Sequence, residues 1–154
     1  MGKGVKCNFK DFKELKDRID KLESADFNNF CEIVAKELAS RLLAKVIKRT
    51  ITGEYPKSSG KVGGTLKRGW TGGKRTDAKS YAESLPIHKK GNLYKIEIVN
   101  PTEYASYVEY GHRTRNHKGW VKGRFMLTIS ENELQTQAPK IIERKLFEYL
   151  GGVL

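Results

Sequence analysis

A long apolar stripe with the spacing of an α-helix runs through residues 27–47. Its apolar side chains recur at intervals of three and four residues, and charged side chains take the other faces. The stripe ends near residues 50–53, where β-branched residues and a glycine disfavour further helix. The pattern predicts one long helix that packs its apolar face on a core. Its apolar positions are Phe27, Phe30, Val34, Leu38, Leu42, Val46 and Ile47.

A shorter apolar stripe of the same kind precedes it. This stripe predicts a helix from Phe9 to Leu22, with charged residues on the remaining faces. Ser24-Ala25-Asp26 separates the two stripes with residues that favour a helix N-cap. The apolar positions of the first stripe are Phe9, Phe12, Leu15, Ile19 and Leu22.

Strand patterns follow the long helix. Leu66–Thr71 is interpreted as a strand with Leu66 and Trp70 on one face. A hairpin is predicted from Ser84–His88 and Leu93–Val99, because apolar and polar residues alternate in the second segment. The residues between them, which include a Gly-Asn pair, form the predicted turn.

The last apolar stripe predicts a C-terminal helix that ends at Gly151-Gly152. Ser130 and Glu133 have the spacing of a capping box at its start. Pro139 is expected to mark either a kink or the true first turn of this helix. The apolar residues on its one side are Ile141, Ile142, Leu146, Phe147 and Leu150.

Together these elements predict an α+β fold, with a long N-terminal helix and a C-terminal helix packed on a small antiparallel sheet. A length of 154 residues with 38% hydrophobic content fits one domain, over residues 1–154, with a modest core.

Three tyrosines and a valine lie within residues 104–110. Their spacing predicts a short amphipathic helix, and Gly111 stands where such a helix would end. We expect Tyr104, Tyr107 and Val108 to be buried with Trp70, and so to join this helix to the sheet.

The net charge of +12 is concentrated in two glycine-containing segments. Residues 53–80 and residues 111–124 each carry a net charge of +5. We expect mobile loops near 53–64 and 111–124, and an anionic partner, either nucleic acid or an acidic protein surface. The alternative is that these basic loops are solvated and have no fixed partner. The candidate partner-binding residues are Lys57, Lys61, Arg113, Arg115, Lys118, Trp120, Lys122 and Arg124.

Trp120 allows two interpretations. It either anchors its loop or offers a surface on which a nucleic-acid base stacks, with the surrounding lysines and arginines on phosphates.

Residues with metal-binding or catalytic chemistry do not form a recognisable site. Cys7 and Cys31 are far apart, and neither has a second cysteine or a histidine at a spacing of two to four residues. A zinc site of His112, His117 and one of these cysteines would have to be assembled by the fold. We therefore expect no metal, no cofactor and no enzymatic activity.

The acidic residues of the tyrosine-rich segment lead to the same expectation. Glu103 and Glu109 lie six residues apart, which does not place them on one helical face. Glu109 is instead expected to form an ion pair with Arg113. Neither Gly60-Lys61 nor Gly73-Lys74 has the spacing of a phosphate-binding loop.

The cellular setting follows from simple features. No apolar run is long enough for a membrane span, and the first residues lack the apolar core of a signal peptide. Two distant cysteines are typical of a reducing cytoplasm. We expect no contact with a membrane.

Three motifs occur in a characteristic order. Residues 63–70 read Gly-Gly-Thr-Leu-Lys-Arg-Gly-Trp, and residues 104–113 read Tyr-Ala-Ser-Tyr-Val-Glu-Tyr-Gly-His-Arg. Residues 123–127, Gly-Arg-Phe-Met-Leu, form a weaker third motif. In this order the motifs resemble the tail-component family of long-tailed bacteriophages, whose members complete the tail and join it to the head. Gly63 and Gly69 depart from the threonine and serine usual in that family.

The resemblance implies a structural role in the virion, at the head–tail junction. It implies contacts with other phage tail or connector proteins, a homo-oligomeric ring, and assembly in the host bacterial cytoplasm. The alternative function is a basic nucleic-acid-binding module. Weak non-specific contact with DNA is compatible with either function.

Overall fold

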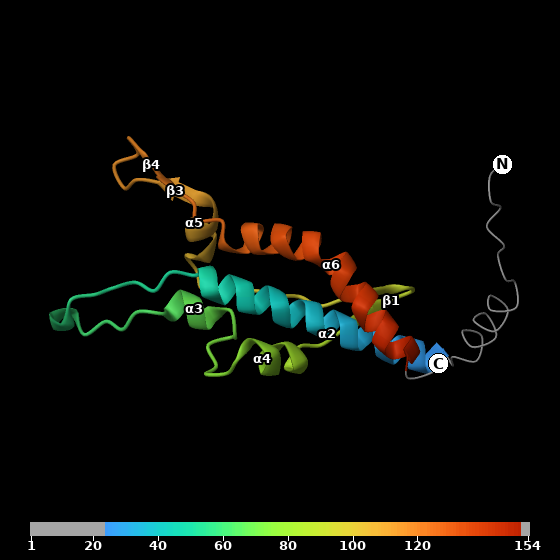
Figure 1. The fold of residues 1–154 in the computed structure, drawn as a ribbon. Helices are drawn as coiled ribbons and strands as arrows, with labels where there is room; N and C mark the ends of the chain where they lie inside the picture. The colour runs from blue at the N-terminus through green and yellow to red at the C-terminus, as the bar shows by residue number, and fades with distance from the viewer. Residues whose placement is uncertain (1–23, 152–154) are drawn as a thin grey trace, which may run out of the picture.

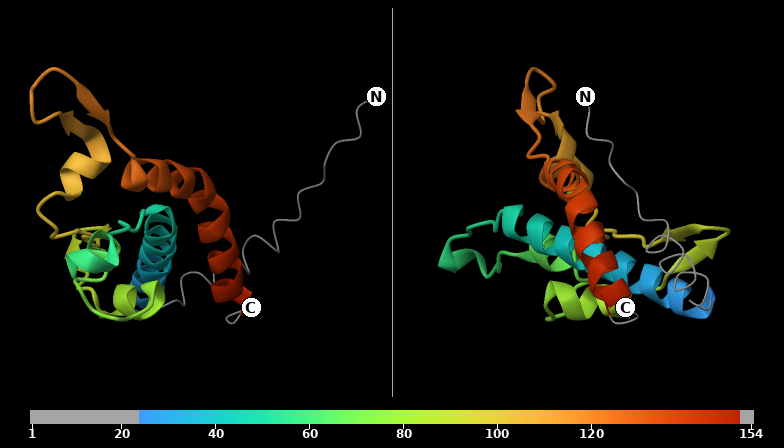
Figure 2. Two further views of the ribbon diagram at one scale, coloured as in Figure 1. Left: turned by 90° about the vertical axis from the view of Figure 1, so that its left-hand side faces the viewer. Right: turned by 45° about the vertical axis from the view of Figure 1, so that its right-hand side comes forward.

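Two long helices dominate the computed structural model, which describes residues 24–151. Helix α2 (Ser24–Arg49) and helix α6 (Met126–Gly151) pack together, and α6 bends along its length (Figures 1 and 2). The short elements between them, in chain order, are η1 (Lys57–Ser59), α3 (Thr65–Gly69), α4 (Ala78–Ser84), β1 (His88–Lys90), β2 (Leu93–Lys95), α5 (Ala105–Tyr110), β3 (Gly111–Arg113) and β4 (Trp120–Lys122).

The predicted α+β class is confirmed. The strands form two separate antiparallel pairs, β1 with β2 and β3 with β4. In the first pair His88 lies opposite Lys95, and in the second Gly111 lies opposite Lys122. The predicted hairpin therefore begins at His88 rather than Ser84, because residues 78–84 form α4. Its first strand extends to Lys90, into the predicted turn, and its second strand ends at Lys95 rather than Val99.

Helix α2 confirms the longest predicted element and lies at the centre of the core. Helix α6 packs along one side of it and α4 along another (Figure 1), so its buried face is wider than one stripe. The predicted positions Leu38 and Leu42 are only half-buried. The buried apolar residues of the central cluster are Ala39, Leu43, Val46, Leu66, Trp70, Ala82 and Met126.

The predicted strand at residues 66–71 is wrong, since this segment contains the helix α3. Leu66 and Trp70 are nevertheless both buried, with 5% and 4% of their surface exposed. Residues four apart share a face in a strand and in a helix alike, so the pattern fixed the buried side but not the element. The indole Nε1 of Trp70 donates to Thr50 Oγ1 at 2.8 Å and joins α3 to the end of α2.

Helix α4 has no counterpart in the sequence-based prediction. Asp77 is its N-cap, and the Asp77 carboxylate accepts a hydrogen bond from the backbone N–H of Ser80 at 2.9 Å. A hydrogen bond from the Ser80 hydroxyl is the main cause that lowers the pKa of Asp77, and the capping bond from the Ser80 N–H adds to it.

The predicted capping box of the last helix is also wrong, because α6 begins at Met126. Ser130 lies within the helix and donates to Met126 O at 2.6 Å. Glu133 accepts from Lys45 Nζ at 3.1 Å and from Arg49, so it links α6 to α2. Pro139 lies inside α6, where a proline cannot donate a helical hydrogen bond, and does not start the helix.

The first predicted helix, from Phe9 to Leu22, lies outside the described residues, as does Cys7. Among residues 24–151, no helix combines the length and apolar character needed to span a bilayer.

Candidate partner-binding surface

The tyrosine-rich segment forms the predicted short helix, α5. The helix ends at Gly111, whose φ of 87° and ψ of 173° lie in a region that is essentially restricted to glycine. The expectation that its tyrosines are buried is wrong: Tyr104 is 43% exposed and Tyr107 is 59% exposed. A six-residue helix presents one face inward, and the packed residues on that face are Ala105, Val108 and Glu109.

The carboxylate of Glu109 holds the first turn of α6. Its Oε2 accepts from the backbone N–H of Leu127 at 3.0 Å, and its Oε1 accepts from the N–H and the hydroxyl of Thr128 at 2.9 and 2.8 Å. These N–H groups have no partner within the helix, and a negative charge is favourable at a helix N-terminus. Glu109 is only 6% exposed and binds α6 rather than the predicted partner, Arg113.

Two glycines let the segment after β4 pass close to the end of α5. A β-carbon at Gly111 would lie 2.4 Å from Val121 O, and one at Gly123 would lie 2.3 Å from Glu109 O. The close approach permits two backbone hydrogen bonds, from Arg124 to Val108 O at 2.8 Å and from Phe125 to Glu109 O at 3.0 Å. Together with the Glu109 cap, these contacts fix α5, the hairpin and α6 relative to one another.

The predicted loop at residues 111–124 contains the β3–β4 hairpin, in which Arg113 lies opposite Trp120. Within the tip, Thr114 Oγ1 accepts from the Gly119 N–H at 3.0 Å. The hairpin and the 51–64 segment project from the same end of the molecule in different directions (Figures 1 and 2). The mobility of residues 53–64 and 111–124 stays a prediction.

The exposed side chains of α5 and the hairpin combine aromatic rings with positive charge. Glu109 is the one acidic residue between positions 104 and 124, and it is buried. The exposed side chains of this region therefore include no carboxylate. We call this set the hairpin surface: Tyr107, Tyr110, Arg113, Arg115, Lys118, Trp120, Val121, Lys122 and Arg124.

Comparison with known proteins identifies the family. The family model described as "Bacteriophage HK97-gp10, putative tail-component" matches residues 13–111, which is more than half of the chain. The chain belongs to this phage tail-component family. No curated protein and no solved structure matches it. Membership implies contacts with other proteins of the phage tail or its connector.

The matched segment of this tail component ends at Gly111. It contains α2, the motif at residues 63–70 and α5, while most of the hairpin surface and α6 lie beyond it. The departures at Gly63 and Gly69 have a steric reason. A β-carbon would lie 1.9 Å from Gly53 O at the first position and 2.1 Å from Asn100 Oδ1 at the second.

The structure places the predicted partner-binding residues of the tail component in two groups. Arg113, Arg115, Lys118, Trp120, Lys122 and Arg124 lie together on or beside the hairpin. Lys57 and Lys61 lie on the separate 51–64 segment, where Lys61 Nζ is 5.8 Å from the centre of the Tyr55 ring. Trp120 is 62% exposed, which favours a role in contacts over a role as a buried anchor.

Sequence reasoning missed the exposed tyrosines Tyr107 and Tyr110. A helix that ends at a glycine after six residues has room for one buried face, and Ala105, Val108 and Glu109 occupy it. The helix length limits the buried face to a few residues, but the burial of Glu109, which shows which face that is, comes from the structure.

Possible metal ligands are not gathered in the described part of the tail component. Residues 24–151 contain no group of three or more histidine, cysteine and carboxylate side chains placed to hold a metal ion. His112 lies beside α5, with its ring 5.7 Å from the Tyr107 ring, and His117 lies in the hairpin tip.

Proposed function

We propose that this tail component completes the phage tail and joins it to the head as a non-catalytic structural protein of the virion. The observation that carries the proposal is the hairpin surface, which exposes aromatic and basic side chains on a firmly held base. Trp120 and Tyr110 are each 62% exposed. Tryptophan, tyrosine and arginine are the residues that most often dominate protein–protein interfaces.

The base of the hairpin supports a role in docking. A binding surface gains affinity when its residues are already held in the bound arrangement, since less ordering entropy is lost. Glu109, Gly111 and Gly123 supply that arrangement through the α6 cap and the close backbone packing. The Glu109 carboxylate, which lies in the motif at residues 104–113, thus has a structural role, and this supports a non-catalytic function.

The proposed partners are other tail or connector proteins and further copies of the chain in a ring at the head–tail junction. A positive surface without exposed carboxylates fits an acidic neighbour, and complementary charge speeds the encounter of assembling proteins. Assembly would take place in the cytoplasm of the host bacterium.

A basic nucleic-acid-binding module is the second candidate function. Its specific support is the exposed Trp120 opposite Arg113, which pairs a stacking surface with a phosphate-binding group. For the tail component we expect only weak, non-specific DNA binding that is lost near physiological salt. Tight, sequence-selective binding at that salt would favour the module instead.

Deletion and complementation in the phage test the proposal. Without the gene, we expect filled heads and unattached tails in the lysate. Complementation by the Trp120→Ala, Lys122→Glu double variant should restore joining poorly. The Lys74→Glu, Arg75→Glu variant is the control, because both side chains are exposed and lie off the hairpin. Infectious particles at normal yield from the deletion would contradict the proposal.

A further inference from the structure

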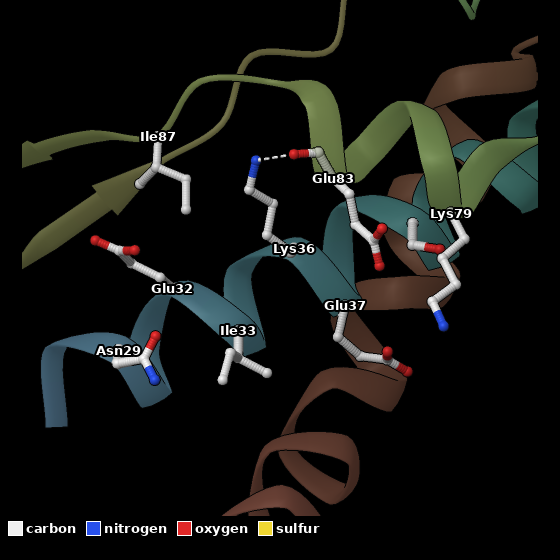
Figure 3. Close-up of a pocket in the computed structure, with 9 residues that line it drawn as sticks. Asn29, Glu32, Ile33, Lys36, Glu37, Lys79, Glu83 and Ile87 are labelled. Atoms are coloured by element: carbon white, nitrogen blue, oxygen red, sulfur yellow. Dashed lines mark hydrogen bonds between the residues drawn. The ribbon is translucent and has the colours of Figure 1, made fainter. Parts of the chain in front are cut away.

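A groove lies between α2, α4 and the segment that leads into β1 (Figure 3). Its volume is about 390 Å³, within the range of roughly 300–1,000 Å³ typical of binding pockets. Ile33, which is 52% exposed, and Ile87 contribute apolar surface. Glu32 and Glu83 contribute exposed carboxylates.

Lys36 shapes this groove and does not neutralise its carboxylates. Its ammonium group donates to the backbone oxygens of Ala82, Glu83 and Leu85 at the end of α4, at 2.9 Å in the case of Glu83 (Figure 3). A cation at a helix C-terminus satisfies carbonyls that the helix leaves without partners. The Lys36 side chain thus holds α4 against α2 and is occupied by backbone groups.

The carboxylates that line the groove differ in their partners. Glu37 forms an ion pair with Arg41 at 2.7 Å. Glu32 and Glu83 form no ion pair with another described residue, although Lys79 also lines the groove. These two exposed carboxylates can therefore receive cations from a partner.

The hairpin surface has the complementary chemistry. Trp120 is a large exposed apolar side chain on β4, and Arg113 lies opposite it on β3. Aromatic anchors of interfaces fill apolar pockets, and charged residues surround them at the rim. We propose that the groove of one copy of the chain binds the β3–β4 hairpin of a second copy. Trp120 then packs on Ile33 and Ile87, and Arg113 and Lys122 face Glu32 and Glu83.

We assign the groove to a second copy because each chain carries both the hairpin and the groove, and the two surfaces lie at different places on it. The hairpin follows α5 at one end of the molecule, whereas the groove lies along α2 and α4 (Figures 1 and 3). A contact between two different surfaces is heterologous, so copies join head to tail and form a ring if the rotation closes. Copies that each carry a net charge of +12 repel one another, and the contact places positive residues on exposed carboxylates. This inference gives the interface of the ring in the proposed function and rests on it.

A mixing experiment with the full-length protein tests the contact. The hairpin variant, Trp120→Ala with Lys122→Glu, removes binding side chains of the hairpin. The groove variant, Glu32→Lys with Glu83→Lys, reverses the charge of the groove. Sedimentation velocity should show that the wild type self-associates with rising concentration and that each variant alone remains a monomer. An equimolar mixture should form species of twice the mass of one chain and no larger, because one intact interface remains per pair. The Glu131→Lys, Glu143→Lys variant is the matched control and should associate like the wild type.

A wild type that is monomeric throughout the concentration range, or a mixture without heterodimers, would overturn the inference. Complementation in the phage separates its failure from that of the proposed function. If the hairpin variant blocks head–tail joining and the groove variant joins normally, the hairpin binds a different protein; the inference then fails and the function stands. If the mixture forms heterodimers but the gene deletion gives normal particles, the contact between copies is supported and the proposed function is contradicted.

Discussion

Replacement of Glu109 by alanine removes the cap of α6 and should destabilise the fold. The carboxylate accepts three hydrogen bonds, two of them from backbone N–H groups of the first helical turn. Glu109 is 6% exposed, so water does not readily replace the lost acceptor. A buried donor left without a partner costs about 1–3 kcal/mol, and loss of a helix cap costs about 0.5–2 kcal/mol.

Because these contributions overlap, we expect Glu109→Ala to lower the free energy of unfolding by about 2–4 kcal/mol. The assay is urea denaturation followed by far-ultraviolet circular dichroism, with linear extrapolation to water. Glu103→Ala is the matched control, since it removes the same charge from an exposed side chain six residues away. Its effect should stay within about 0.5 kcal/mol. Equal stabilities of the two variants would show that Glu109 does not hold the start of α6.

Three further predictions follow from the described contacts. Gly111→Ala should cost more stability than Gly73→Ala in the same urea assay, because both glycines have positive φ but only at Gly111 would the β-carbon meet a backbone oxygen; equal losses would argue against close packing there. Tyr107→Ala should change the unfolding free energy by less than about 1 kcal/mol, since the side chain is 59% exposed; a loss of about 3 kcal/mol, as for a buried aromatic residue, would contradict its surface position. The pKa of Glu133 is lowered chiefly by the hydrogen bond from Arg49, so this contact stabilises the fold above the ordinary pKa of 4.5 and is lost as the pH falls through the folded value. Wild type and Glu133→Gln should therefore converge in stability in acid, and a difference that is independent of pH would refute the ion pair.

Periodic patterns predicted the parts of the fold in which one face is buried over a long stretch. The apolar stripe of α2 marked its length to within a few residues, because both α4 and α6 cover that helix. The burial alternation over residues 93–99 was also correct, with Tyr94, Ile96 and Ile98 half-buried between exposed neighbours, although the strand itself ends at Lys95.

Short elements escaped prediction because their patterns were ambiguous. Leu66 and Trp70 are four residues apart, a spacing that a strand and a helix bury equally well. Ser130 and Glu133 have capping-box spacing, yet Glu109, which is distant in the sequence, caps α6 instead. A cap supplied by another element is a tertiary contact, and no local pattern reveals it.

The candidate surface was predicted in part. The concentration of positive charge in residues 111–124 identified this segment from the sequence, and in the structure its basic residues lie on or beside a hairpin. The tyrosines of α5 were assigned to the wrong side, because the amphipathic spacing does not state which face carries the contacts of a short helix. Their exposure follows once Glu109 is known to point toward α6.

Immunogold labelling of intact virions tests the central claim most directly. An antibody against this protein should place gold at the head-proximal end of the tail in electron micrographs, at the junction with the filled head. Gold along the tail or at its distal tip, or virions that contain none of the protein, would contradict a role in joining tail to head.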